Sequence, residues 1–540
     1  IGVRSGRALL VDSENNLWVG GYCGLDKIDR TTGKITRYIE FDDPFYSELH
    51  YSVNINPHIY SLVEDPRYPD SLLWMGTEGG GLYQFDRKNI RFRHFPEGPA
   101  DKKGLLGHSV LEIISEGEDY LWIGTELGLN RFDLATEEIR HFNCEEITGI
   151  NVGSIIALHL DKEGNLWAGT ENAGMCKFDP SSNKIEHFNH SSDSSLSYNR
   201  IHCICEDSRG RIWIGTGGGG LNLFDRKSGH FTSYLMDDGL PNNVVYGILE
   251  DKTGRLWLST NNGLSVFNPE TETFKNYDSR DGLQSDEFNN GAYYKSRTGE
   301  MFFGGIKGLN SFNPEDIVVN DYVPPVVLTE FQIFNKPVPI GKADNEKTIL
   351  PEAIGEVERL VLDYDNNVFS FTFAALNYII PEKNRYAYMM DGFDRDWQYV
   401  DNRRYVTYTN LEPGEYMFRV KGSNNDGVWN EAGAAVAVTI LPAWWETGGF
   451  RVAAFALAAG LLLGGFRLRM KALEGRRREL ERQVDRRTRE LRESEARYRD
   501  LFENMTSGVA VYEPVDDGAD FILRDFNRAG ERIERIARDE

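Results

Sequence analysis

The stretch RIWIGTGGGGLNLFD, from Arg211 to Asp225, decides the fold. An apolar, strand-like run is followed by Gly215, Gly217 and Gly220 in the spacing G-x-G-x-x-G. In a dinucleotide-binding fold such a loop opens a helix whose N-terminus faces a pyrophosphate. The residues that follow here alternate like a strand and then turn, so that helix is not predicted. Whether the stretch is a binding loop therefore depends on whether it is unique.

The stretch is one of seven related copies in the first 316 residues. Successive anchor residues are 56, 48, 45, 46, 44 and 45 positions apart. The copies are LWVGGYCGLDKID at Trp18, LWMGTEGGGLYQFD at Trp74, LWIGTELGLNRFD at Trp122, LWAGTENAGMCKFD at Trp167, IWIGTGGGGLNLFD at Trp213, LWLSTNNGLSVFN at Trp257 and MFFGGIKGLNSFN at Phe302. An internal period of 40 to 50 residues is typical of a repeat architecture.

Each unit reads as four short strands. An upstream strand ends in a D-x-x-G turn before the tryptophan, and a second amphipathic run such as HFTSYL follows the FD pair. Four strands in about 45 residues indicate a β-propeller blade, so residues 1–316 are predicted to form a seven-bladed β-propeller. The chain is thus expected to be mainly β.

The recurrent glycines and acids then have structural explanations. The glycines after the tryptophan are expected in the tight turn between two inner strands, and the Gly-Thr pair is expected to let neighbouring blades pack closely. Catalytic or metal-binding roles are the alternative for the acids, which are expected first as turn residues. These acids are Asp12, Asp65, Asp161, Asp207 and Asp251.

Composition narrows the class of partner. The formal net charge is −24, and the basic residues concentrate between 467 and 500. An acidic folded portion argues against nucleic acid, because phosphate binding needs Lys and Arg. The cysteines lack C-x-x-C pairs, the histidines lack metal spacing, and all five cysteines are interpreted as packing residues, so no metal site is predicted. They are Cys23, Cys144, Cys176, Cys203 and Cys205.

Residues 317–442 predict a β-sandwich. Alternating runs such as VFSFTFAAL, YVTYTNL and AVAVTIL are separated by turn clusters, including LEPGEY. This spacing is typical of immunoglobulin-like or fibronectin-like domains. Its aromatic residues are expected in the hydrophobic core, with binding roles as the alternative.

Residues 443–467 predict one membrane-spanning helix. The run FRVAAFALAAGLLLGGF has 17 residues, near the short end of what crosses a bilayer, and Trp444 and Trp445 form an interfacial anchor before it. A buried helix is the alternative. Residues 431–449 hold acids and no basic residue, whereas the stretch after the span is rich in Arg and Lys. The positive side is expected in the cytoplasm, which places residues 1–449 outside and residues 467–540 inside an inner membrane crossed once.

Residues 468–500 predict a coiled-coil helix. Apolar residues follow the alternating three-four spacing of a heptad seam, which favours a homodimer with parallel helices. A single basic helix lying on anionic lipid is the alternative. The seam residues are Leu473, Leu480, Val484, Leu491 and Tyr498, with Leu501 following.

The repeat D-x-x-G-x-LW-I-G-T-x-x-GL-x-x-FD resembles the two-component regulator propeller. The FAALNYIIPEKNRYAY segment resembles the Y_Y_Y domain of the same sensors, with Tyr378, Tyr386 and Tyr388 as its tyrosines. Residues 501–540, from LFENM through GVAVYE to ILRDFNRAGERIE, resemble the opening of a PAS domain. A chain that starts at Ile1 and stops about 40 residues into a domain of roughly 100 is expected to be truncated at both ends.

The resemblance implies the receptor half of a transmembrane sensor. It implies a histidine kinase output that lies outside this chain and signals to a response regulator, with a diguanylate cyclase as the alternative output. No catalytic residues and no cofactor are assigned within this chain. A PAS cofactor is left open, and ATP is expected only for the kinase domain.

A small molecule, with carbohydrate-derived compounds favoured by the resemblance, is the expected ligand. The insertion FDDPFYSELHYSVNINPHIY places four candidate ligand residues in a loop at a blade edge, where propellers bind. The alternatives are loop packing for these residues, and a membrane-tethered propeller enzyme or a protein-binding scaffold for the chain. A glycosidase would need two facing carboxylates, and no singular pair stands out. The candidates are Phe45, Tyr46, His50 and Tyr51.

Overall fold

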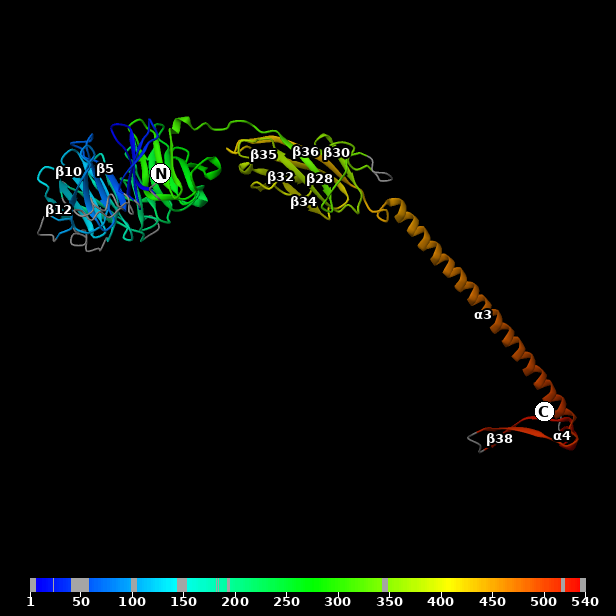
Figure 1. Cartoon of the computed structure of the whole chain (residues 1–540). Helices are drawn as coiled ribbons and strands as arrows, with labels where there is room; N and C mark the ends of the chain where they lie inside the picture. The colour runs from blue at the N-terminus through cyan, green and yellow to red at the C-terminus, as the bar shows by residue number, and fades with distance from the viewer. Residues whose placement is uncertain are drawn as a thin grey trace. The chain divides into compact units, whose positions relative to one another are not determined.

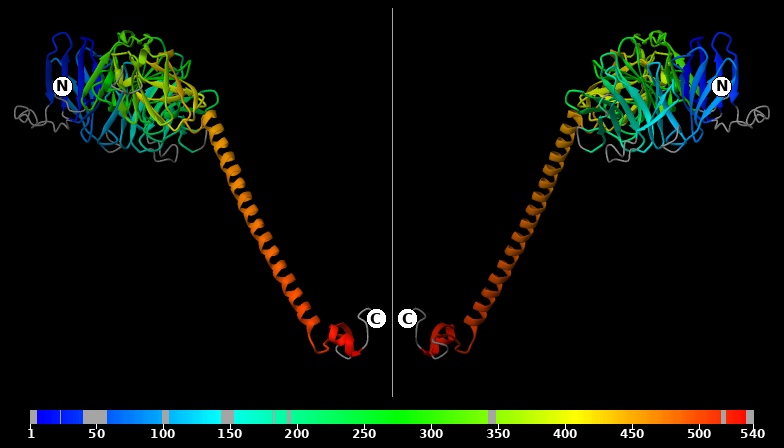
Figure 2. Two further views of the ribbon diagram at one scale, coloured as in Figure 1. Left: turned by 90° about the vertical axis from the view of Figure 1, so that its right-hand side faces the viewer. Right: turned by 90° about the vertical axis from the view of Figure 1, so that its left-hand side faces the viewer.

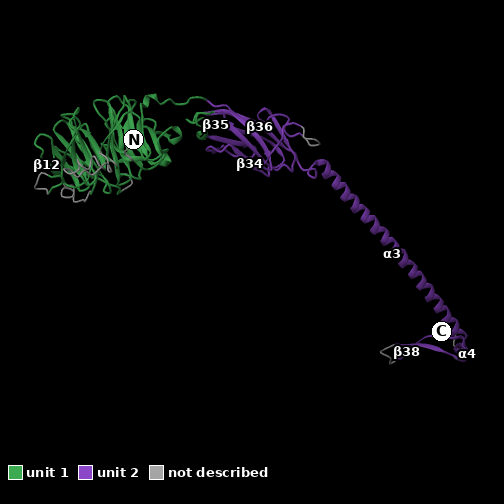
Figure 3. Cartoon of the chain, in the orientation of Figure 1, with its two compact units in different colours: residues 1–322, 377–384, 424–428 green, residues 323–376, 385–423, 429–540 purple. Residues whose placement is uncertain are grey.

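The structure is a computed structural model that divides into two compact units (Figure 3). Unit 1 comprises residues 1–322, 377–384 and 424–428, and unit 2 comprises residues 323–376, 385–423 and 429–540. The described residues are 6–22, 24–39, 58–98, 104–142, 153–180, 182, 184–191, 195–341, 348–515 and 520–534.

Unit 1 is built from antiparallel sheets whose strands follow one another in chain order (Figure 1). Its described residues form six four-stranded sheets and one three-stranded sheet. Sheets one to three contain β1 (Gly6–Val11), β2 (Asn16–Gly21), β3 (Gly24–Asp29), β4 (Ile35–Ile39); β5 (Ile59–Glu64), β6 (Leu72–Thr77), β7 (Gly81–Asp86), β8 (Arg91–Phe95); and β9 (Val110–Glu116), β10 (Tyr120–Thr125), β11 (Gly128–Asp133), β12 (Ile139–Phe142).

The remaining sheets of unit 1 continue the pattern. Sheets four and five contain β13 (Ile155–Leu160), β14 (Leu166–Thr170), β15 (Met175–Asp179), β16 (Lys184–Phe188); and β17 (Ile201–Glu206), β18 (Ile212–Thr216), β19 (Leu221–Phe224), β20 (Phe231–Tyr234). Sheets six and seven contain β21 (Val245–Glu250), β22 (Leu256–Thr260), β23 (Gly263–Asn268), β24 (Thr273–Tyr277); and β25 (Phe288–Lys295), β26 (Met301–Gly305), β27 (Gly308–Phe312). Short 3-10 helices η1 (Met236–Asp238), η2 (Ser279–Asp281) and η3 (Pro314–Asp316) lie between or after them.

The sheets close on one another through their first strands. Each first strand contacts the first strand of the next sheet, and β25 contacts β1. Arg30 of the first sheet forms an ion pair of 2.6 Å with Glu300 of the seventh. Asn289 donates a hydrogen bond of 2.9 Å to the Gly6 carbonyl. The first strands therefore surround a common axis, as in a propeller.

The tryptophans join neighbouring sheets. The six tryptophans of the repeats are buried. Each packs between an aromatic residue of the fourth strand in its own sheet and the phenylalanine of the third strand in the next sheet. Trp167, for example, lies 6.1 Å from Phe188 and 5.3 Å from Phe224 between ring centroids. The repeat therefore encodes one aromatic contact per sheet junction.

The acids before the tryptophans are turn residues, as predicted, and they also bind the indoles. Asp161 Oδ1 accepts the Asn165 backbone N–H at 2.8 Å, and its Oδ2 accepts Trp167 Nε1 at 2.8 Å. The same indole bond forms at Trp18, Trp74, Trp213 and Trp257. Trp122 differs, because Glu116 occupies the acid's place and pairs with Arg131 instead. No partner for Trp122 Nε1 lies among the described residues.

These turn acids predict a loss of stability in acid. Burial acts to raise the pKa of Asp161, but the bonds from Trp167 and Asn165 outweigh it and hold the pKa below its usual value. The pKa values of Asp207 and Asp251 are lowered for the same reasons. A lowered folded-state pKa contributes stability that is complete above the unfolded value of about 3.9 and is lost as pH falls through the folded value.

We therefore expect the melting temperature of the full chain to be steady from neutral pH to about pH 5 and to fall progressively below about pH 4. Scanning calorimetry across this range measures it. Asp207→Asn should make the fall in melting temperature at low pH shallower, because an asparagine side chain does not titrate. An unchanged pH profile in this variant would contradict the assignment.

The glycines of the opening stretch are turn and packing residues, as predicted. Gly220 has φ +70°, in the left-handed region that glycine adopts at the β18–β19 turn. At Gly215, a Cβ atom would come 2.9 Å from Val245 Cγ1 in the next sheet. At Gly169, the equivalent atom would come 2.6 Å from Ile201 Cγ2. The glycine after each of these tryptophans thus allows the neighbouring sheet to approach.

Unit 2 begins with two sheets that form a sandwich. One has the order β29-β28-β31-β34 and the other β30-β36-β35-β32-β33. All pairs are antiparallel except β30 with β36, which are parallel. The strands are β28 (Val326–Ile333), β29 (Lys336–Pro337), β30 (Arg359–Leu362), β31 (Val368–Ala375), β32 (Tyr386–Asp391), β33 (Gln398–Val400), β34 (Tyr405–Thr409), β35 (Gly414–Ser423) and β36 (Trp429–Ile440), with η4 at Ile354–Glu356 and η5, in unit 1, at Pro381–Lys383.

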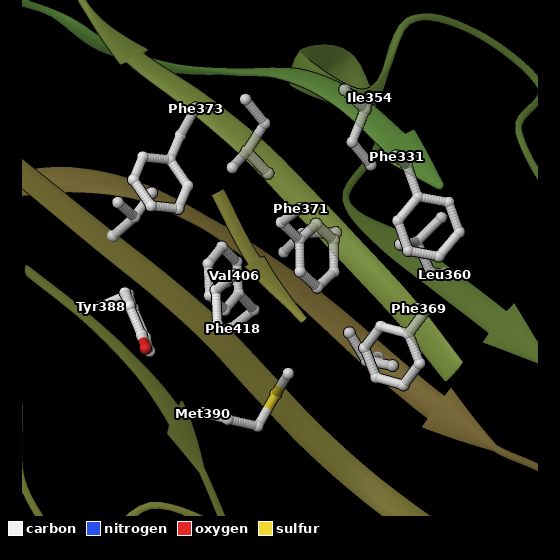
Figure 4. Packing of buried hydrophobic residues seen from close by; sticks show 14 of the residues in the cluster. Phe331, Ile354, Leu360, Phe369, Phe371, Phe373, Tyr388, Met390, Val406 and Phe418 are labelled. Carbon is white, nitrogen blue, oxygen red and sulfur yellow. The ribbon is translucent and has the colours of Figure 1, made fainter. Parts of the chain in front are cut away.

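The sandwich core is aromatic (Figure 4). Phe371 and Phe418 stack with their ring centroids 4.3 Å apart. Tyr386 and Tyr388 are also buried, as expected. Tyr378 contradicts the prediction that the aromatic residues lie in the core, because it is 79% exposed. It lies in the segment that leaves the sheet after β31, where the two-residue alternation of strands no longer applies.

A single unbroken helix, α3 (Gly448–Asn504), follows the sandwich (Figure 2). Among the described residues it is the one helix long and apolar enough to cross a membrane. Trp444 and Trp445 precede it, and Trp444 packs on Phe450 with centroids 4.9 Å apart. The predicted seam residues are exposed on its later turns: Leu473, Leu480, Val484, Leu491, Tyr498 and Leu501. After α3 come β37 (Ala510–Val515), β38 (Asp520–Phe526) and α4 (Arg528–Glu534).

Candidate functional site

The loop predicted from sequence to bind a ligand lies outside the described residues. It contains Phe45, Tyr46, His50 and Tyr51, which remain predictions. Cys23 and Cys144 also lie outside them, whereas Cys176 and Cys203 are buried. The site that can be built from described residues is elsewhere in unit 1.

A cavity of about 340 Å³ lies beside the sixth and seventh sheets of unit 1. Two segments that come much later in the chain, residues 377–384 and 424–428, belong to the same unit and supply part of its wall. The cavity is lined by Trp257, Leu264, Lys275, Tyr277, Asp281, Gly282, Leu283, Asn310, Ser311, Phe312, Ile317, Val318, Ile380, Asn425 and Asp426.

The cavity exists because the seventh sheet is narrower than the others. Its third strand, β27, has no fourth strand beside it among the described residues. Trp257 still packs between Tyr277, at 5.8 Å, and Phe312, at 4.8 Å, as its siblings do. Phe312 and Ser311 on β27 are then left to line a cavity instead of a further strand.

Ion pairs attach both late segments to the propeller sheets. Lys383 Nζ lies 3.0 Å from Asp278 Oδ2 and also pairs with Asp281, and only 12% of the Lys383 side chain is exposed. Lys275 Nζ lies 3.0 Å from Asp426 Oδ1. Burial acts to raise the pKa of Asp278, but hydrogen bonds from Arg280 and Lys383 outweigh it and lower that pKa strongly. Asp278 is therefore ionised at neutral pH.

An asparagine network joins the two late segments to each other. Asn377 donates to Asn384 Oδ1 at 2.8 Å and to Asn425 Oδ1 at 3.1 Å. Asn320, in the chain that leaves the seventh sheet, donates to Asn425 Oδ1 at 2.7 Å. Asn424 donates to the Asn320 carbonyl at 2.7 Å. A buried network whose members satisfy one another specifies one arrangement of its segments.

Sequence reasoning missed these residues, although a signal was present. The asparagines stand in FAALNYIIPEKN and GSNNDGVW, two loops of a segment interpreted for its strands and aromatic core. Asparagine in loops is commonly a turn residue, so its pairing with distant asparagines is not visible locally.

The geometry suits a small polar molecule. Ligand sites are usually about 300–1,000 Å³, with apolar and aromatic walls and a few placed polar groups, and this cavity combines both kinds of wall. Lys275 Nζ is buried and lacks a hydrogen bond of normal geometry despite its ion pair. Within the described ranges, no three His, Cys, Asp or Glu side chains gather to hold a metal ion.

The sheets of unit 1, the β-sandwich and the membrane-capable helix follow one another along the chain, and family models match both β regions. The two component regulator propeller model matches residues 149–172, 195–218 and 239–262. The Y_Y_Y domain model matches residues 377–441, which include both late segments of the cavity wall. The chain therefore contains two-component regulator propeller repeats and a Y_Y_Y domain.

Two proteins are similar to the chain over most of its length. The chain is 30% identical over 442 residues to Histidine kinase P4 of Formosa agariphila, which covers 80% of this chain and 28% of the relative. The crystal structure of the extracellular domain of the hybrid two component system BT3049 from B. thetaiotaomicron matches with a TM-score of 0.67 and 25% identity, over 82% of this chain and 56% of that one. The chain thus spans little more than a quarter of its curated relative.

Proposed function

We propose that the chain is the ligand-sensing and signal-transmitting half of a transmembrane histidine kinase. A small molecule, with carbohydrate-derived compounds favoured, binds outside the membrane. Residues 1–449 lie outside, α3 crosses the bilayer, and residues 467–540 lie in the cytoplasm and begin a PAS domain. The kinase domain and its response regulator act beyond this chain.

The observation that carries the proposal is the composition of the cavity wall. Propeller strands β24 and β27 supply one side, and two segments within the matched Y_Y_Y region supply the other. A molecule bound there contacts both the propeller strands and the two late segments of unit 1. A ligand shifts a conformational equilibrium only through different affinities for the two states, and contacts to both elements provide such a difference.

Transmission inward is supported by α3. Its apolar turns, including Phe455, Leu461 and Leu462, are exposed, as expected of side chains that lipid covers. The helix continues unbroken from this span into the basic turns that carry the heptad seam. In a homodimer paired along that seam, a change in how the two ectodomains are arranged would reach the PAS domain through the continuous helix.

Filling the cavity tests its role. We expect Ser311→Trp, which adds a large side chain to the exposed face of β27, to weaken ligand binding by about tenfold or more while the chain stays folded. The measurement is the shift in melting temperature of the full chain in nanodiscs with a panel of oligosaccharides. Ser233→Trp, on the exposed β20 outside the cavity, is the matched control.

Two outcomes would contradict the proposal. One is an oligosaccharide shift that survives Ser311→Trp unchanged. The other is a chain that no small molecule stabilises but that co-purifies with one protein partner, which would favour a scaffold. Fusing the chain to a histidine kinase domain and measuring ligand-dependent phosphorylation then tests the output.

A further inference from the structure

A β-bulge occurs at the same place in the first strand of sheets one to six. In each, one residue has no partner in the ladder with the second strand. The seventh sheet has a longer irregularity between Phe288 and Tyr293. In the seventh sheet residues 289–292 are unpaired. The name axial ring is given to Asn289 and Asn290 of this stretch together with the unpaired residues of the other sheets, which are Arg7, Tyr60, Leu111, Ile156, His202 and Tyr246.

The axial ring repeats in backbone but not in side chain. Bulges re-aim side chains and are frequent beside functional sites. The fold requires the bulge in every sheet, yet the six residues are arginine, two tyrosines, leucine, isoleucine and histidine. Other positions of the repeat, such as the tryptophans, keep one residue type because packing demands it. Variation at a structurally equivalent position indicates that these side chains serve something other than the fold.

The polar members of the axial ring form two contact groups, and the Arg7 charge of one acts on Tyr246 of the other. The Arg7 guanidinium lies 4.7 Å from the ring centroids of Tyr60 and Tyr22. His202 lies 5.1 Å from Tyr246 between centroids. Asn289 reaches the Gly6 carbonyl, which adjoins Arg7. Sheets five, six, seven, one and two therefore supply a polar arc, whereas Leu111 and Ile156 of sheets three and four supply an apolar one.

Arg7 has no carboxylate partner among the described residues. Its guanidinium donates to the Tyr22 hydroxyl and stacks on two tyrosine rings, and Arg7 Nε has no acceptor. Other arginines of the same sheets are paired, including Arg30 with Glu300, Arg87 with Asp12 and Arg226 with Asp161. An arginine that stacks on two tyrosine rings and has no counterion in the described part of a chain of net charge −24 is suited to an anion.

His202 adds a second group with unmet capacity. It is 7% exposed, and burial lowers its pKa to about 4, so the imidazole is neutral at physiological pH. A hydrogen bond with Asn290 acts to raise that pKa, although its geometry is poor, because neither His202 Nδ1 nor Asn290 Oδ1 has a hydrogen bond of normal geometry. Polar groups that are buried and incompletely bonded cost stability unless a ligand or water completes them.

We propose that the axial ring binds a small organic carboxylate. The carboxylate pairs with Arg7, the neutral His202 and Asn290 bond its polar substituents, and its apolar part lies against Leu111 and Ile156. Arg7, Tyr60, Tyr246 and Asn290 are each partly exposed, so the arc can be reached from solvent. This site is separate from the cavity beside sheets six and seven.

The test compares each carboxylate with a neutral analogue. Acetate, hexanoate, phenylacetate and glucuronate are paired with their amides or, for glucuronate, with glucose, and melting temperatures of the full chain in nanodiscs are measured. We expect at least one carboxylate to raise the melting temperature by about 2 °C or more beyond its neutral analogue. Arg7→Gln should abolish this difference, Arg7→Lys should keep part of it, and Ser311→Trp should leave it intact.

Arg209→Gln is the matched control, because Arg209 is exposed and already paired with Glu270 at 2.5 Å. Should Arg7→Gln not fold, Ile156→Glu is expected to abolish the difference by placing a negative charge on the apolar arc. The proposal is overturned if no carboxylate exceeds its neutral analogue, or if the difference survives in Arg7→Gln or Ile156→Glu. A response lost in Ser311→Trp instead would assign the ligand to the cavity.

Discussion

Replacing Asp161 by alanine is expected to lower the stability of the propeller unit by about 3 kcal/mol. The carboxylate is buried and accepts Trp167 Nε1 at 2.8 Å. It also pairs at 3.1 Å with Arg226 of the next sheet. The substitution leaves an indole N–H without an acceptor inside the sheet junction. Arg226 retains Glu163 and Glu206, which limits the loss.

The third sheet provides the matched control, because its tryptophan lacks the bond. Glu116→Ala removes only a part-exposed ion pair with Arg131, so the loss of stability should stay within about 1 kcal/mol. Likewise, Trp167→Phe should lower the free energy of unfolding by about 1 kcal/mol more than Trp122→Phe does. Of these two tryptophans, Trp167 donates to an acid and Trp122 does not. Calorimetry and hydrogen exchange of β13 and β14 measure these differences. Equal costs for the two tryptophans would contradict the assignment.

Replacing Lys383 by methionine is expected to release the first late segment from the propeller sheets. The ammonium is nearly buried between Asp278 and Asp281, and removing one partner of a buried ion pair typically costs about 3–5 kcal/mol. Arg280 still pairs with Asp278, so we expect the lower end of that range. The asparagine network should weaken with it, because Asn384 follows Lys383 directly.

The measurement is amide hydrogen exchange of residues 377–384 and 424–428 in the full chain. We expect exchange there to accelerate by about 100-fold in Lys383→Met while β13 to β20 keep their protection. Lys252→Met removes an exposed pair with Glu315 and should change nothing measurable. In the kinase fusion, Lys383→Met should also separate ligand binding from phosphorylation. Unchanged exchange in both segments would refute a role for Lys383 in holding them.

Much of the fold could be predicted because it depends on sequence patterns that repeat over short distances. The tryptophan repeat, the D-x-x-G turns and the alternating strands each recur within one unit, so a unit can be recognised without knowing its neighbours. The mainly β architecture, the Y_Y_Y domain and the membrane-capable helix are confirmed. Tyr378 was placed wrongly in the core, because a motif name does not say which of its residues leave the sheet.

The candidate site could not be predicted in this way. Asn320, Asn377 and Asn425 are up to 105 residues apart, and nothing in the surroundings of one indicates the others. The same holds for the axial ring, whose members come from seven separate sheets. The loop chosen from sequence, with Phe45 and Tyr51, was selected for length and aromatic content alone.

The sequence by itself determined that a ring of repeated sheets precedes a sandwich and a membrane-capable helix. Local hydrophobic periodicity and turn chemistry suffice for that, because each element forms mainly through contacts within its own unit. Only the tertiary structure decided that RIWIGTGGGGLNLFD closes against Val245 of the next sheet and that the narrow seventh sheet leaves a cavity. It also brought Arg7 and His202 into one ring, since contacts between distant residues arise from ring closure and not from any local pattern.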